Sequence, residues 1–403
     1  MDAVRRYSDG VTHRTPNGVK LRPTGNLTIT PQADITRIIL RDGINKPDEP
    51  NRFDRPNTIR RADGIWVMVY REGRHHWEDQ YKADATIRFL KPDGTWTEDN
   101  TYLDGSPVVY DSRTPTPDNP ETGPSEFKLL LCPNGDLLLH GWDIDYNVWN
   151  NGTFQCRSTD GGKTWGPWSQ INFLNAPIAS TSIMMLEDTF IYDGVLYSAT
   201  RYKDADTDPN EGGYFVKTVD NGITWEYIST IIHHTFGTRG VAEYSLEYIG
   251  NNRLVCFLRD KSNCYTWIVF SDDFGATWGT PRRIDNDDLI LGTESCNFYR
   301  VRTFTDSHLK GRNNWWNDPF IVNNGYRNTV QCQSINSRQP GIVLSNDRLT
   351  SMTKVQFVDN AAPEDAGYGN SYYNDYTNKY GFITYYGYVD RSDIREYQYE
   401  IDW

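Results

Sequence analysis

The feature that most constrains this chain of 403 residues is an eight-residue pattern, Ser/Thr-x-Asp-x-Gly-x-Thr-Trp, which occurs three times. The copies begin at Ser158, Thr218 and Ser271, so their starts are 60 and 53 residues apart. In each copy the Asp can accept backbone N–H bonds across a tight turn, and the Gly can supply the positive φ that such a turn needs. Because turns repeated at this period are typical of propellers, we expect an array of similar β units, each with a buried Trp.

A second repeat supports the same interpretation. Hairpin turns followed by apolar strands fall near residues 64, 135, 194, 252 and 381, in steps of 71, 59, 58 and 129, the last of which is two periods. Weaker copies of the first pattern occur at 91–96 and 345–347. Aromatic residues make up 14% of the chain, and no window shows sustained helical spacing of apolar residues. The sequence therefore predicts an all-β protein, a six-bladed β-propeller with four strands in each blade.

The N-terminal segment has a different character from the repeats. Residues 1–34 are polar and rich in turn signals, whereas 35–40 form an apolar run just ahead of the first unit. We therefore predict a propeller over 35–403, preceded by a segment that serves either for attachment or for closing the ring. The apolar run is the better candidate for pairing with the C-terminal strand.

Composition excludes several classes of partner. The formal net charge of −13 disfavours nucleic acid and anionic membranes as main partners. No run of 18 apolar residues predicts membrane insertion, and no apolar segment near Met1 predicts a signal peptide. The six cysteines are widely spaced without a CxxC motif, so we expect isolated thiols, no metal and no cofactor.

One inner hairpin carries a more specific signal. Glu243 opens a strand, the chain turns at Asn251 and Asn252, and Arg259 closes the returning strand sixteen positions after the Glu. Together with the three repeats, which we call Asp boxes (158–165, 218–225 and 271–278), this element resembles the sialidase (neuraminidase) superfamily. The resemblance covers about residues 50 to 390, and it implies a six-bladed propeller that acts on an acidic glycan. Arg71 and Arg201 end corresponding strands in other units, so Arg259 can also be explained as a repeated rim arginine.

The resemblance implies three arginines that hold the sugar carboxylate. Arg55 lies where the family has its first arginine, although it abuts Pro56 directly, and Arg259 would be the second. Arg338 matches the third, with Arg327 as the rival. Guanidinium groups suit this task because they bind a carboxylate with two parallel hydrogen bonds.

The resemblance also implies a tyrosine nucleophile, the glutamate that takes its proton and an aspartate acid/base. Glu243 matches the glutamate and Asp79 the aspartate, with Asp84 as the fallback. Tyr372 or Tyr373, just before the last inner hairpin, would be the nucleophile. A phenol suits this reaction because the sugar's own carboxylate repels a carboxylate nucleophile.

Two kinds of function fit these residues. The first is a sialidase-like glycoside hydrolase that acts on an acidic, sialic-acid-type glycan. The second is a glycan-binding or receptor-binding propeller without catalysis, for example on a viral tail or a cell surface. A lyase or an endo-acting depolymerase on the same scaffold is a third possibility, because a fold alone does not fix the chemistry.

Overall fold

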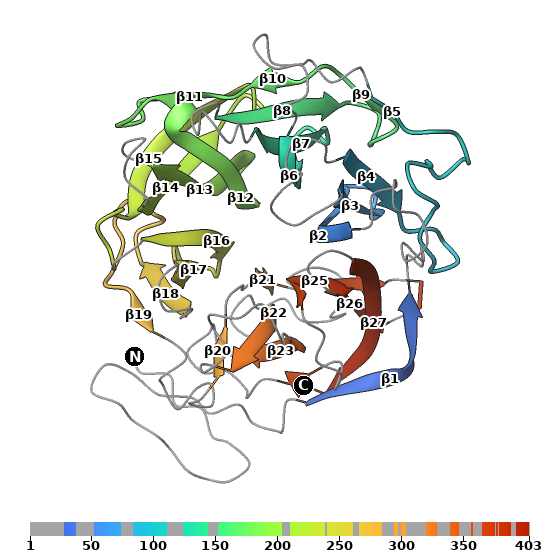
Figure 1. Ribbon diagram of the computed structural model, residues 1–403. Helices are drawn as coiled ribbons and strands as arrows, with labels where there is room; N and C mark the ends of the chain where they lie inside the picture. Colours follow the sequence, from blue (N-terminus) through green and yellow to red (C-terminus); the bar gives the residue numbers. More distant parts are fainter. Residues whose placement is uncertain are drawn as a thin grey trace.

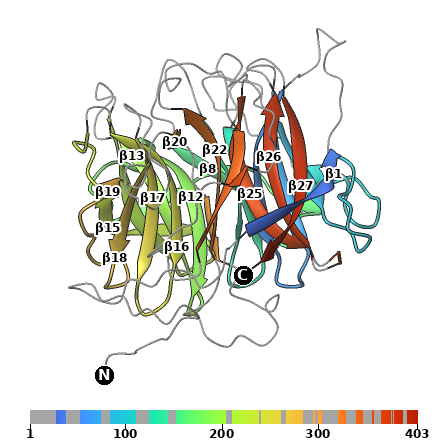
Figure 2. The same ribbon diagram turned by 90° about the horizontal axis from the view of Figure 1, so that it is seen from below.

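The computed structural model describes residues 28–37, 52–73, 84–110, 124–143, 152–203, 210–237, 240–260, 266–283, 294–296, 300–303, 320–328, 339–345, 356–357, 365–374, 376–377, 379–387 and 392–402. In this part of the chain the strands form six blades around a central axis (Figure 1). The strands run along that axis, as the side view shows (Figure 2). The predicted all-β propeller is therefore confirmed.

From the axis outwards, blade 1 consists of β2 (Arg52–Arg60), β3 (Trp66–Gly73) and β4 (Asp84–Phe89). Blade 2 consists of β6 (Pro124–Leu131), β7 (Leu137–Asp143), β8 (Thr153–Ser158) and β10 (Ser169–Gln170). Blade 3 consists of β12 (Ile183–Tyr192), β13 (Val195–Lys203), β14 (Glu211–Thr218), β15 (Thr224–Ile232) and β11 (Asn172–Leu174). Blade 4 consists of β16 (Val241–Tyr248), β17 (Leu254–Asp260), β18 (Thr266–Ser271) and β19 (Arg282–Arg283). Blade 5 consists of β20 (Glu294–Cys296), β21 (Arg300–Thr303), β22 (Phe320–Asn328), β23 (Gln339–Ser345) and β24 (Gln356–Phe357). Blade 6 consists of β25 (Asp365–Asn374), β26 (Lys379–Gly387), β27 (Ser392–Asp402) and β1 (Thr28–Arg37). A short parallel pair, β5 (Val109–Tyr110) and β9 (Thr164–Trp165), and a 3-10 turn, η3 (Ser180–Ser182), complete the described elements.

The ring is closed by a strand from the N-terminal part of the chain. β1 pairs antiparallel with β27 and is the outermost strand of the sixth blade (Figure 1). The register runs from Thr28 opposite Asp402 to Arg37 opposite Arg395. The closing strand therefore begins ahead of the predicted domain boundary near residue 34. Joining the two ends of the chain in one sheet adds backbone hydrogen bonds where the ring would otherwise be open.

Each Asp box forms the hydrogen-bonded turn that its sequence predicts. In the box of blade 3, Asp220 Oδ1 accepts the backbone N–H groups of Ile223 and Thr224, each at 3.0 Å. Thr218 Oγ1 donates to Asp220 at 2.7 Å and accepts the N–H of Gly222 at 2.8 Å. Gly222 has a φ of 83°, as expected of the glycine in this turn. The bonds to Asp160 and Asp273 in the other boxes follow the same pattern.

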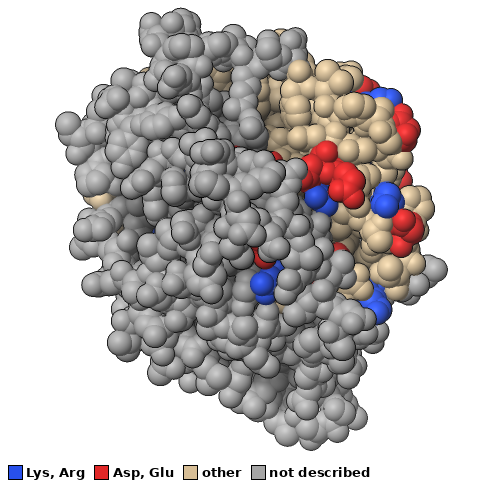
Figure 3. All heavy atoms as spheres, turned by 45° about the vertical axis from the view of Figure 1, so that its right-hand side comes forward, with Lys and Arg blue, Asp and Glu red and all other residues tan. Residues whose placement is uncertain are grey.

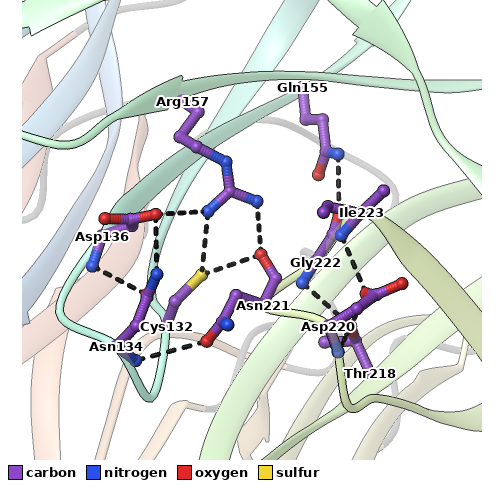
Figure 4. Close-up of polar contacts among 10 residues, drawn as sticks. All are labelled: Cys132, Asn134, Asp136, Gln155, Arg157, Thr218, Asp220, Asn221, Gly222 and Ile223. Carbon is purple, nitrogen blue, oxygen red and sulfur yellow. Dashed lines mark hydrogen bonds and ion pairs between the residues drawn. The ribbon is translucent and has the colours of Figure 1, made fainter.

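The boxes also join neighbouring blades, and Figure 4 shows this for blades 2 and 3. Gln155 Nε2 donates to the Gly222 carbonyl at 2.7 Å, and the Cys132 thiol donates to the Asn221 carbonyl at 3.3 Å. Arg157 donates to the same Asn221 carbonyl and is paired with Asp136 at 2.7 Å. Blade 3 is therefore fixed to blade 2 by bonds that satisfy the buried polar groups of the turn.

The box tryptophans are core residues. Trp165 is 2% exposed and Trp225 is fully buried, whereas Trp278 is half-buried. Trp225 packs with Leu130 and Leu138 of blade 2, and its ring lies edge-on to His140. The predicted burial is therefore confirmed for Trp165 and Trp225, and Trp278 is more exposed than we expected.

We expect Trp225→Ala to lower the free energy of unfolding by about 3 to 5 kcal/mol, because a buried indole is replaced by a cavity between two blades. Trp278→Ala is the matched control, and its loss is expected to be smaller because part of that ring already contacts water. Urea unfolding followed by circular dichroism measures both. Equal losses at the two positions would contradict this account of the blade interface.

Candidate functional site

A β-bulge recurs at one end of the innermost strands. The register against the second strand shifts in five of the blades, between residues 54 and 57, 124 and 126, 184 and 186, 242 and 244, and 367 and 370. All five lie at the end of the strand opposite to the hairpin turn, so they gather at one face of the ring. A bulge leaves a residue without a partner and re-aims its side chain, and bulges are frequent next to active sites. We call this face the rim.

Two predicted site residues occupy these bulges in an unusual backbone conformation. Arg55 and Glu243 have φ values of 54° and 55°. In the described part of the chain, the other non-glycine residues with positive φ lie in turns or loops, and most of them are Asn or Asp. Left-handed backbone costs a long side chain free energy, and such conformations cluster at functional sites. The strain therefore marks the two rim positions that the sequence singled out.

Glu243 and Arg259 form an ion pair at the rim. Arg259 Nη1 lies 2.7 Å from Glu243 Oε1, and the two side chains keep 26% and 16% of their surface exposed. The pair is local in the fold because Ala242, the residue before Glu243, lies opposite Arg259 in the β16–β17 register. The spacing of sixteen residues is thus that of a hairpin whose two ends meet at the rim.

The arginines at equivalent places in two other blades differ from Arg259. Arg71 lies opposite Asp54 and Arg201 opposite Met184, in the same register positions. Arg71 is fully buried, and Arg201 is 6% exposed and ion-paired with Glu187 at 2.9 Å. A rim arginine is therefore repeated in the fold, but Arg259 is the more exposed of the three. Exposure is what a residue needs in order to meet a ligand.

The other predicted site residues lie in different parts of the chain, and two of them fall outside the described residues. Arg55 is buried to 8% exposure in the bulge of β2. Arg327 lies near the end of β22, where it pairs with Ser295, and nothing further is described of its side chain. Asp79 and Arg338 lie outside the described residues. The fallback Asp84 begins β4 opposite Glu72.

Tyr372 is a core residue, not a rim residue. It is fully buried, its ring lies edge-on to Trp66 and Trp96 at 5.5 Å, and its hydroxyl donates to Glu396. The contact we expected between this hydroxyl and Glu243 is therefore replaced by one to Glu396. The residue lies opposite Gly381 near the hairpin turn, at the end of β25 away from the rim.

Tyr373 lies next to it, opposite Tyr380, so its backbone is also near the hairpin turn. The sequence argument chose both residues because they precede the turn, and this position is what takes them away from the bulge.

A further tyrosine that the sequence argument did not consider, Tyr368, lies nearer the rim. In β25 the register shifts between Gly367, opposite Tyr385, and Asn370, so Tyr368 occupies the bulge. Gly367 and Tyr385 correspond to Ala242 and Arg259 in blade 4, which makes Tyr368 the positional counterpart of Glu243. A strand rises about 3.3 Å per residue, so Tyr368 is roughly 13 Å closer to the rim than Tyr372.

Glu396 has its own consequence for stability. It is 1% exposed, and burial raises the pKa of its carboxyl from 4.5 to about 7. The folded state therefore keeps a proton that the unfolded state releases above about pH 4.5. The stabilising effect of this group is complete below that pH, declines as the pH rises towards 7, and is lost above it.

We expect Glu396→Gln to remove this pH dependence. An amide oxygen still accepts the Tyr372 hydrogen bond, but it does not ionise. The free energy of unfolding of the wild type, relative to the variant, should fall by about 3 kcal/mol between pH 4.5 and pH 8, at 1.36 kcal/mol per pKa unit. Urea unfolding across this pH range measures the difference. A constant difference would show that Glu396 is ionised throughout.

Surface charge and possible metal ligands do not help to locate the site in the described part of the chain. In the space-filling view of one side, described acidic and basic side chains lie next to one another (Figure 3). Within the described residues, no group of three or more His, Cys, Asp and Glu side chains could hold a metal ion. Cys132, Cys156 and Cys256 are buried free thiols, as expected for these three. No helix in the same part of the chain has the length and apolar character needed to span a membrane.

Comparison with known proteins places the fold. No protein-family model matches the chain, and no curated protein matches its sequence. Among solved structures, a protein of unknown function from Dyadobacter fermentans is 15% identical, with a TM-score of 0.62 over 88% of this chain and 96% of that one. The NanB sialidase from Streptococcus pneumoniae is 11% identical, with a TM-score of 0.62 over 91% and 70%.

A third structure widens the range of activities found on this fold. The α-L-arabinofuranosidase Arb93A from Fusarium graminearum is 11% identical, with a TM-score of 0.55 over 92% of this chain and 96% of that one. At such identities the similarity concerns the fold and not the substrate. The chain therefore has the propeller fold that is found in sialidases.

Proposed function

We propose that the protein is a sialidase-like glycoside hydrolase that acts on an acidic glycan. The observation that carries the proposal is the partly exposed ion pair between Glu243 and Arg259, which lies at a strained bulge on the rim. Arg55 occupies the corresponding bulge in blade 1 and Tyr368 that in blade 6. An arginine that binds carboxylate, a glutamate base and a tyrosine are the groups that this chemistry requires.

The roles follow from charge. Arg55, Arg259 and Arg338, or Arg327 in place of Arg338, bind the sugar carboxylate with bidentate hydrogen bonds. Tyr368 attacks the anomeric carbon while Glu243 takes the phenolic proton, so the nucleophile does not meet the substrate as a second carboxylate. Asp79 protonates the leaving oxygen as the glycosidic bond breaks. Water, deprotonated by Asp79, then displaces the tyrosine, which takes its proton back from Glu243, and the anomeric configuration is retained.

A fluorogenic sialoside tests the proposal directly. Release of the fluorophore by the purified protein, with retention seen by NMR of the first-formed sugar, supports it. A matched fluorogenic α-L-arabinofuranoside is the control, because one structural neighbour is named for that activity. Cleavage of the arabinofuranoside alone would contradict an acidic substrate.

A specific observation favours a second function, that of a glycan-binding propeller without catalysis. Glu243 Oε1 already accepts a hydrogen bond from Arg259 at 2.7 Å, so this oxygen is engaged by the arginine and not by a tyrosine. Binding to a glycan array, lost in Arg259→Met and accompanied by no cleavage of any sialoside, would select this function.

A further inference from the structure

Polar contacts join the inner strands of four successive blades just beneath the rim. Between blades 1 and 2, Asn57 Oδ1 accepts the backbone N–H of Leu129 at 2.8 Å. Between blades 2 and 3, Lys128 Nζ lies 3.2 Å from Glu187 Oε2. Between blades 3 and 4, the Ser245 hydroxyl donates to the Asp188 carboxylate. We call this set the inner belt, and its side-chain members are Asn57, Lys128, Glu187, Asp188 and Ser245.

The belt is buried although most of it is polar or charged. Ser245 is fully buried, and the other four members are 3% to 7% exposed. Apolar packing already fills the interfaces between these blades, so the belt is not needed to exclude water. Buried polar contacts add little net stability, but they accept only one geometry, and losing one partner is costly. Such contacts fix how far one strand slides against the next.

The belt follows directly on the rim bulges. Asn57 is two residues after Arg55, and Ser245 is two residues after Glu243. A strand rises about 3.3 Å per residue, so Ser245 lies roughly 7 Å below Glu243. Tyr244, the residue between Glu243 and Ser245, also contacts blade 3. Its ring packs so closely on Gly213 that a Cβ atom added to this glycine would lie 2.3 Å from the ring. The strand that carries Glu243 is thus fixed to blade 3 at two successive residues.

We infer that the Ser245–Asp188 contact positions Glu243, and through it Arg259, for the ligand. Ser245 is a positioning residue, because it is buried beneath the rim and touches no reacting atom. The inference rests on the proposed function for its kinetic consequence, but its structural consequence, the geometry of the ion pair, stands without turnover. A left-handed conformation at a residue such as Glu243 persists only where the surrounding structure fixes it, and the contact with Asp188 helps to fix this strand against blade 3.

A matched pair of Ser→Ala variants tests the inference. Ser245→Ala removes the belt contact between blades 3 and 4. Ser229→Ala removes another buried hydroxyl between the same blades, since Ser229 Oγ donates to the Gly275 carbonyl at 2.5 Å and accepts from Trp278 Nε1 at 3.0 Å, away from the rim. Both should lower Tm by similar amounts. If Ser245→Ala does not fold, Ser245→Cys, which keeps a weaker donor of similar size, takes its place.

Turnover of the fluorogenic sialoside is the first measurement. Ser245→Ala should lower kcat by about 10- to 100-fold with KM within roughly threefold of wild type, the usual cost of displacing a catalytic group by about 1 Å. Ser229→Ala should leave both unchanged. Asp188→Asn, which keeps an oxygen acceptor for Ser245, should retain most of kcat. Equal losses of kcat in the two alanine variants, or a full loss in Asp188→Asn, would overturn the inference.

Crystal structures of both alanine variants are the second measurement, and they separate this inference from the proposed function. The Glu243–Arg259 separation, 2.7 Å in the wild type, should lengthen by about 1 Å or more in Ser245→Ala and stay unchanged in Ser229→Ala. An unchanged pair in Ser245→Ala overturns the positioning role, whatever the activity. A wild type that turns over no sialoside while the pair moves as expected overturns only the hydrolase.

Discussion

Replacing Glu243 with Gln is expected to lower kcat for a fluorogenic sialoside by about 10³-fold, while the affinity for the glycan changes little. A phenol of pKa about 10 is a weak nucleophile at neutral pH, and general base catalysis of its attack contributes about 10² to 10⁴. Gln keeps the size of the side chain and an oxygen that can accept from Arg259, so the binding arginine stays in place. Steady-state kinetics measure kcat, and calorimetric titration with the product sugar measures affinity.

Glu226→Gln is the matched control for charge. Glu226 forms an ion pair with Lys217 at 3.2 Å on β15, and 44% of its side chain is exposed. Its loss changes the net charge by the same amount as Glu243→Gln but should leave kcat unchanged. Normal turnover by Glu243→Gln would remove the base from the proposed mechanism. A large loss of affinity in that variant would instead assign Glu243 to ligand binding.

Tyr368→Phe is expected to lower kcat by on the order of 10⁴-fold or more, because deletion of a covalent nucleophile removes the first chemical step. Tyr372→Phe is expected to keep turnover and to lower the free energy of unfolding instead. The latter variant removes the Tyr372 hydroxyl from the buried Glu396 carboxyl, and the loss of such a hydrogen bond costs about 1 to 3 kcal/mol. The same substitution at two nearby positions thus separates chemistry from folding.

The two tyrosine variants are compared by kinetics and by urea unfolding. Mass spectrometry of the wild type after reaction with a 2,3-difluorosialoside adds a direct test, since the trapped sugar should be attached to the peptide that contains Tyr368. A kcat that survives in Tyr368→Phe and disappears in Tyr372→Phe would return the nucleophile to the residue before the hairpin. It would also require Tyr372 to leave its contact with Glu396.

The sequence by itself determined the repeating unit. The Asp boxes fold as predicted because the hydrogen bonds among Asp220, Thr218 and Gly222 that define the turn form within eight residues. The Glu243–Arg259 pair was predictable for a similar reason, since one hairpin brings both residues to the same end. Local hydrogen bonds and a fixed strand period were sufficient in both cases.

Only the tertiary structure decided which repeated residues face the core and which face the rim. Arg71, Arg201 and Arg259 look alike in sequence, but burial against neighbouring blades leaves Arg259 the most exposed. Tyr372 became a core residue because Trp66 and Trp96, far away in the chain, cover its ring.

The contact between Asp188 and Ser245 also depends on the packing of one blade against the next. These two residues are 57 positions apart, and the repeated pattern alone does not indicate which side chains of neighbouring blades meet.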